Sequence, residues 1–174
     1  MRFAKPIDLF QKLLESNKIA EQRLLGLDVG NRYVGLAISD PDNKIASPLS
    51  VLVRKKSNIV QMAMDIQTLV KEFSLIGLVV GYPLALQGTA NPQAVQVKVF
   101  VEELHRTGQL DGLSYTYWDE RFTSKSVEAL LKPLDMHPVQ FKTIVDKFAA
   151  VGILQGYLDH VHRNMKASEQ ESND

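Results

Sequence analysis

Asp28 is an acidic residue in a segment that otherwise resembles a buried strand. It lies in the apolar run LLGLDVG at residues 24–30, and period-two alternation places it on the same face as Leu24 and Gly26. A carboxylate on a packed face is unfavourable unless it gains a polar or metal partner. The alternative interpretation is an aspartate that caps a turn.

Two more acids follow another apolar run, in the segment WDER at residues 118–121. If the strand persists, Asp119 and Glu120 point to opposite faces, so only one of them faces the side of Asp28. Ligand crevices in open sheets lie at the carboxyl ends of parallel strands, where both acids would sit. Alternatively, Asp119 ends the strand and Glu120 pairs with Arg121 in solvent.

Asp146 lies in a segment with helical periodicity and shares a stripe with Ala150 and Ile153. An acid beside such a small, apolar surface is costly unless it is paired or bound to a metal. Lys142 or Lys147 could provide the pairing.

Together these carboxylates form a plausible set of hard oxygen ligands for two Mg²⁺ or Mn²⁺ ions. Two ions ~4 Å apart can activate a water and stabilise the leaving oxygen of a phosphodiester displacement. No side-chain nucleophile is then needed.

The composition limits the classes of protein to consider. Lys plus Arg and Asp plus Glu both total 20, so a nucleic acid would have to bind through a local patch. The chain has no cysteine, which excludes disulfides and thiolate zinc sites. It also has no apolar run of about 18 residues that could span a membrane. We therefore expect a cytoplasmic protein with no membrane partner.

The order of the elements predicts an α/β protein with a ribonuclease H-like fold. Three antiparallel strands and then two parallel strands would form a five-stranded mixed sheet flanked by helices. We expect a helical extension at residues 1–22, the domain at 23–163 and a disordered acidic tail at 164–174. The expected strands are 24–30, 33–39, 45–53, 75–82 and 113–119, and the expected helices are 57–73, 93–106, 124–131 and 138–161.

Four motifs in order resemble the YqgF/RuvX family of RuvC-like Holliday junction resolvases, some of which are assigned to pre-16S ribosomal RNA maturation. The motifs are LDVGNRYVGLAISD at 27–40, VVGYPLALQGTANP at 79–92, DERFTS at 119–124 and VDKFAAVGILQGYL at 145–158. The resemblance implies a ribonuclease H-like nuclease whose catalytic carboxylates are Asp28, Glu120 and Asp146. Asp119 would be an additional metal ligand.

Candidate nucleic-acid-binding residues are Arg32, Arg121, Lys125 and Lys147, of which Arg121 and Lys147 adjoin predicted catalytic acids. The basic run at 54–56 is a further candidate, but solvated surface charge is the favoured interpretation of each of its residues. The expected partners are RNA or branched DNA, with ribosomal or transcription proteins as further candidates. The chain could act as a monomer or as a homodimer, and the N-terminal helix is one candidate dimer surface.

Two other functions remain open at this point. One is a non-catalytic adaptor that binds nucleic acid or protein in the ribosome or transcription machinery. The other is a phosphate-binding domain of the actin, Hsp70 and sugar-kinase type, which would need a second copy of the domain to enclose a nucleotide. The sequence does not distinguish a ribosomal RNA precursor from a four-way DNA junction.

Overall fold

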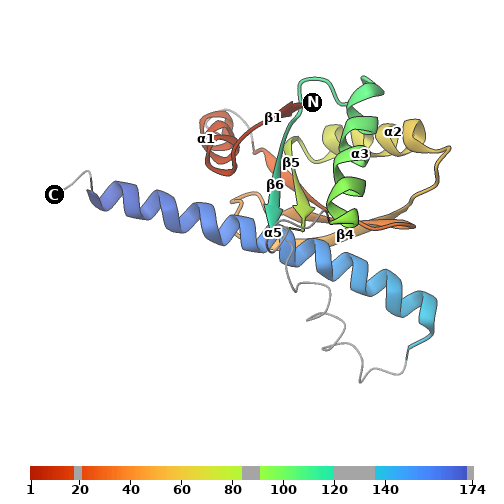
Figure 1. Cartoon of the computed structure of the whole chain (residues 1–174). Helices are drawn as coiled ribbons and strands as arrows, with labels where there is room; N and C mark the ends of the chain where they lie inside the picture. The colour runs from red at the N-terminus through yellow and green to blue at the C-terminus, as the bar shows by residue number, and fades with distance from the viewer. Residues whose placement is uncertain (18–20, 84–90, 120–135, 172–174) are drawn as a thin grey trace.

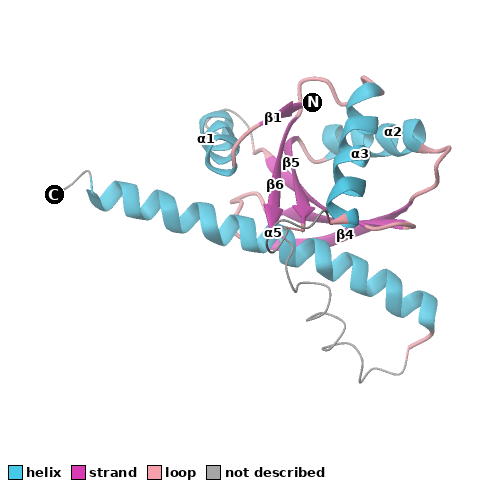
Figure 2. Cartoon of the chain, viewed as in Figure 1, coloured by secondary structure: helices cyan, strands magenta, loops and turns pink. Residues whose placement is uncertain are grey.

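The protein is a six-stranded mixed sheet with helices on both faces (Figures 1 and 2). The computed structural model describes residues 1–17, 21–83, 91–119 and 136–171. The strands are β1 (Arg2–Phe3), β2 (Arg23–Val29), β3 (Tyr33–Ser39), β4 (Ala46–Val53), β5 (Leu75–Tyr82) and β6 (Ser114–Asp119). The helices are α1 (Pro6–Asn17), α2 (Ile59–Glu72), α3 (Pro92–Arg106) and α5 (Pro138–Glu171).

The strand order confirms the predicted ribonuclease H-like arrangement. The sheet runs β1-β6-β5-β2-β3-β4; β2, β3 and β4 pair antiparallel, whereas β5 is parallel to both β2 and β6. The sheet has six strands instead of the expected five because β1 pairs parallel with β6. A two-residue strand is too short to produce a recognisable alternation, so no pattern in the sequence indicates it.

Alternation along β2 divides its side chains between two cores. Leu25, Leu27 and Val29 pack with α2 and α3 on one face of the sheet. Leu24 packs with α1 and α5 on the other face. By the same alternation Asp28 faces the α5 side, as the sequence predicted.

The N-terminal helix is part of the core and does not stand apart from the domain. Leu9, Phe10 and Leu13 of α1 are fully buried in the cluster that also contains α5. The Tyr157 hydroxyl of α5 donates a hydrogen bond to the Pro6 carbonyl at 2.8 Å. The apolar face of α1 is therefore used inside this chain, which argues against the helix as a dimer surface.

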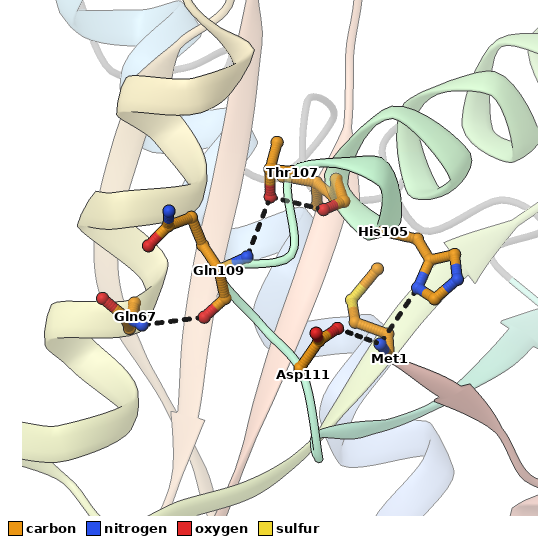
Figure 3. A network of polar contacts seen from close by, with 7 residues as sticks. Met1, Gln67, His105, Thr107, Gln109 and Asp111 are labelled. Atoms are coloured by element: carbon orange, nitrogen blue, oxygen red, sulfur yellow. Dashed lines mark hydrogen bonds and ion pairs between the residues drawn. The ribbon is translucent and has the colours of Figure 1, made fainter.

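The connection between α3 and β6 forms polar contacts with α2 and with the N-terminal residue (Figure 3). The Gln67 side chain of α2 donates to the Gln109 carbonyl at 2.8 Å, and the Gln109 amide donates to the Thr107 hydroxyl at 3.3 Å. The Met1 amino group lies 3.6 Å from the Asp111 carboxylate. These contacts hold the segment that precedes β6 in place, and Asp119 is the last residue of that strand.

The last helix, α5, crosses the sheet and extends beyond it at both ends (Figure 1). It continues through Glu171, so the expectation of a disordered tail from residue 164 was wrong for residues 164–171. Met, Lys, Ala, Glu and Gln in this stretch all have high helix propensity, which the acidic composition obscured. No helix among the described residues has the length and apolar character required to cross a membrane.

Candidate metal centre

Asp28 and Asp146 meet across a glycine. Asp28 on β2 pairs in register with Gly35 on β3, and Gly35 lies against the main chain of Asp146 on α5. A Cβ atom at position 35 would overlap the Asp146 carbonyl oxygen. The absence of a side chain at this point brings the helix down onto the sheet beside Asp28.

A second glycine, Gly26, allows the same close approach further along α5. A Cβ atom on Gly26 would lie 2.8 Å from the Leu154 Cβ and 3.1 Å from the Ala150 carbonyl oxygen. Ala149 and Ala150 are themselves buried, which confirms the small, apolar helical surface that the sequence predicted beside Asp146.

The electrostatics of the two acids leave negative charge uncompensated. The pKa of the Asp28 carboxyl is raised from 3.8 to about 6: burial contributes most of the rise, the nearby Asp146 adds to it, and Lys142 opposes it. The Lys142 ammonium lies 2.8 Å from Asp146 Oδ1, so the expected lysine pairing is real for one oxygen. Asp146 Oδ2 is buried and accepts no hydrogen bond from the described residues.

This donor set suits a divalent cation. The Asp146 oxygen that lacks a partner in the described part of the chain lies beside a carboxyl group that resists ionisation, and a positive ion between them would stabilise both. A cavity of about 480 Å³ opens at this point, lined by Asp146, Lys142, residues 30–33, Pro138 and Val139. An ion and part of a substrate could both enter there.

Comparison with known proteins identifies the family. The sequence profile described as "RuvX: Holliday junction resolvase" matches residues 22–160. The chain belongs to the RuvX family. The matched segment begins just before β2 and ends within α5, so it includes both acids of the candidate centre.

Several curated proteins resemble this RuvX member along most of its length. A protein named "Putative pre-16S rRNA nuclease" from Ruminiclostridium cellulolyticum is 33% identical over 145 residues, covering 83% of this chain and 99% of the relative. One of the same name from Rhodospirillum centenum is 36% identical over 143 residues, covering 81% and 75%. Among solved structures, T. thermophilus RuvC in complex with a Holliday junction substrate matches at 14% identity and a TM-score of 0.49, over 80% of this chain and 95% of that one.

The DER segment of this RuvX chain is described only at its first residue. Asp119 ends β6 and pairs in register with Tyr82, so it lies at the same edge of the sheet as Asp28. Tyr117 packs on the α2–α3 side, and by alternation Asp119 follows it there, opposite to Asp28. This placement favours Glu120 over Asp119 as a third ligand.

Glu120 itself lies outside the described residues, as do Arg121 and Lys125, and their assignments stay predictions. Most of the glycine-flanked loop at 81–88 is also outside them. Within the described part of the RuvX chain no group of three or more His, Cys, Asp or Glu residues gathers around one point. Asp28 and Asp146 are therefore the two described members of the site.

The other predicted binding residues lie at different distances from the acid pair. Arg32 is exposed on the β2–β3 turn and lines the cavity with Asp146. Lys147 is partly buried and is absent from the lining of that cavity, because adjacent helix positions point about 100° apart. Lys142, one turn before Asp146, occupies the position facing the cavity.

Two residues that the sequence did not single out for this role hold the end of β2. The Arg54 guanidinium donates to the Gly30 carbonyl at 3.0 Å, and the Gln93 side chain donates to the Val29 carbonyl at 2.8 Å. Both acceptors directly follow Asp28 in the RuvX motif. Arg54 was visible only as one member of a basic run, and nothing in the sequence marked Gln93.

Proposed function

We propose that this RuvX-family chain is a divalent-metal-dependent nuclease that hydrolyses phosphodiester bonds in structured nucleic acid. The observation that carries the proposal is the meeting of Asp28 and Asp146, with one buried oxygen that has no partner among the described residues and with the Asp28 pKa raised to about 6. Such a pair is unfavourable as it stands and is suited to hold a hard cation. Glu120, the residue that follows β6 in the sequence, is our candidate for the third ligand.

Asp28, Asp146 and Glu120 would hold Mg²⁺ or Mn²⁺, two ions in the full site. Bound there, the metal supplies water activation and stabilisation of the leaving oxygen. Asp28 must be ionised to act as a ligand, so its raised pKa makes binding weaker below about pH 6. Arg32, at the mouth of the cavity, is placed to orient a backbone phosphate.

The names of the relatives support a ribosomal RNA precursor as the first substrate to test. The description of the family profile supports a four-way DNA junction as the second. Both substrates present phosphodiesters to the same carboxylates, so the chemistry proposed for the site is common to them. Symmetric cutting of a junction would in addition require two copies of the chain.

The test is cleavage of labelled pre-16S rRNA, four-way DNA junctions and single strands, with Mg²⁺, Mn²⁺ or EDTA. Wild type should cut at least one substrate in the presence of metal, whereas Asp28→Asn and Asp146→Asn should each lower the rate by at least a hundredfold. Asp42→Asn changes an exposed aspartate in a turn and is the matched control. Metal-independent cutting, or unchanged cutting by both variants, would overturn the proposal.

The adaptor function predicts a different result from the same experiment. Wild type would then bind one of these nucleic acids and cut none of them under any metal condition. Binding is measured in parallel for this reason.

A further inference from the structure

A second hollow lies beside the metal-binding cavity. Its volume is about 470 Å³, and Asn31, at the β2–β3 turn, lines both hollows. The first hollow contains Asp146, whereas the second contains the three consecutive cations Arg54, Lys55 and Lys56. We call this second hollow the basic pocket.

Arg54 is a fixed part of the wall of the basic pocket. Its guanidinium donates to the Gly30 carbonyl, and its Cζ lies 5.0 Å from the centre of the Phe100 ring. Its main-chain amide donates to the Arg32 carbonyl at 2.8 Å. The first cation of the run is thus tied to the β2–β3 turn, which begins two residues after Asp28.

Lys55 and Lys56 are exposed and are presented by a structured turn. The Asn58 side chain accepts from the Lys55 amide at 2.8 Å and donates to the Val53 carbonyl at 2.8 Å. Neither lysine side chain forms an ion pair with a described residue. Their ammonium groups are therefore available to a ligand while their main chain is held in place.

The lining of the basic pocket selects for an anion. Three cations face one carboxylate, that of Glu103, and the amide side chains of Asn31, Asn58 and Gln96 add hydrogen-bond donors. The whole chain is electrically neutral, so this excess of positive charge is a local feature and not a reflection of the composition. Lysine, arginine and amide donors are the groups that contact backbone phosphates.

We propose that the basic pocket binds a backbone phosphate of the nucleic-acid strand whose neighbouring phosphodiester lies at Asp28 and Asp146. This inference rests on the proposed function and deepens it, because it assigns the direction in which the substrate leaves the acid pair. The strand would cross the β2–β3 turn at Asn31. Arg54 would contact the phosphate and, through the Gly30 carbonyl, help to fix the strand end that carries Asp28.

The test compares Lys55→Ala/Lys56→Ala with Lys44→Ala/Lys71→Ala, a pair of exposed lysines outside both hollows. Binding of a labelled single-stranded RNA is measured by fluorescence anisotropy in EDTA over a series of salt concentrations. Loss of one or two phosphate contacts should reduce the slope of log K against log salt by about 0.7–1.4. The control pair should keep the wild-type slope. Lys55→Gln/Lys56→Gln should reproduce the alanine result, which excludes a packing effect of the truncated side chains.

Because binding is measured without metal, the result is independent of catalysis. A reduced slope in a protein that cuts nothing would support the basic pocket and overturn the nuclease. Equal slopes for the two double variants, in a protein that does cut, would overturn the pocket alone. No binding of the RNA by wild type would overturn the basic pocket, and the cleavage assay would then decide on the nuclease by itself.

Discussion

Gly35 lies directly against the main chain of Asp146, so close that any Cβ atom at position 35 would overlap the Asp146 carbonyl oxygen. Because Gly35 is also the β-sheet partner of Asp28, this single contact sets how near the two acids approach. The geometry of the site therefore depends on a residue that has no side chain.

Gly35→Ala should push α5 away from the sheet and separate the acids. We expect a loss of about 1–3 kcal/mol in the free energy of unfolding, as for an overpacked core. Stabilisation by Mg²⁺ should also be lost. The control is Gly156→Ala, where a Cβ would lie 3.1 Å from the Trp118 indole nitrogen, a side-chain atom that can move. Urea unfolding with and without Mg²⁺ measures both effects, and an undiminished Mg²⁺ effect in Gly35→Ala would contradict the prediction.

Asp28→Asn should stabilise the metal-free protein, and only above about pH 4. The Asp28 pKa is raised from 3.8 to about 6, so folding favours its protonated form. Stability from this group is therefore present at low pH and is lost as the pH rises through about 4 to 6. The variant lacks this loss and should gain up to about 3 kcal/mol over wild type at pH 7.5, with almost no difference at pH 4. The measurement is urea unfolding in EDTA from pH 4 to pH 7.5. An equal difference between variant and wild type at these two pH values would refute the prediction.

Lys142→Met should lower the stability of the metal-free protein and increase the rise in melting temperature that Mg²⁺ produces. The ammonium group neutralises part of the Asp146 charge and lowers the Asp28 pKa, so its loss leaves both acids less compensated. Because Lys142 is 57% exposed, we expect a cost below about 1 kcal/mol. The shift in melting temperature on adding Mg²⁺ should exceed that of wild type and of a Lys71→Met control. A smaller shift would show that Lys142 assists metal binding.

Phe10→Ala should destabilise the whole domain by about 3–5 kcal/mol, because the α1 side chain is 1% exposed in the core shared with α5. Leu14→Ala, on the same helix at 39% exposure, should cost well under half as much. Thermal unfolding of the two variants tests whether α1 is integral to the fold. Equal, small effects would show that the extension is dispensable.

The regular parts of the fold follow from local patterns. Alternation along β2 predicted which face Asp28 would occupy, and the helical stripe predicted that Asp146 would meet a packed surface. Both inferences hold because each pattern depends on one element alone. The sequence offered two lysines as ion partner, and the observed partner, Lys142, is the one that lies a helical turn from Asp146.

The relationships between distant elements could not be predicted in this way. The hydrogen bond from Arg54 to Gly30 depends on how the residues after β4 lie relative to the end of β2. The periodicity of a single strand or helix contains no information about such a contact. The role of Gly35 depends on which helix crosses it. Glu120 is a prediction from the family motif, and the orientation of Asp119 in β6 supports it only indirectly.

The acid pair joins an early strand to the last helix of the chain. A polypeptide that ended between β2 and α5 would contain Asp28 but not Asp146, however well its sheet had formed. During synthesis, the centre can assemble only after this part of α5 has been made, since the two acids lie far apart in the sequence. For a proposed nuclease, this means that a chain without α5 lacks one of the two acids, and that the packing of α5 against Gly35 completes the pair.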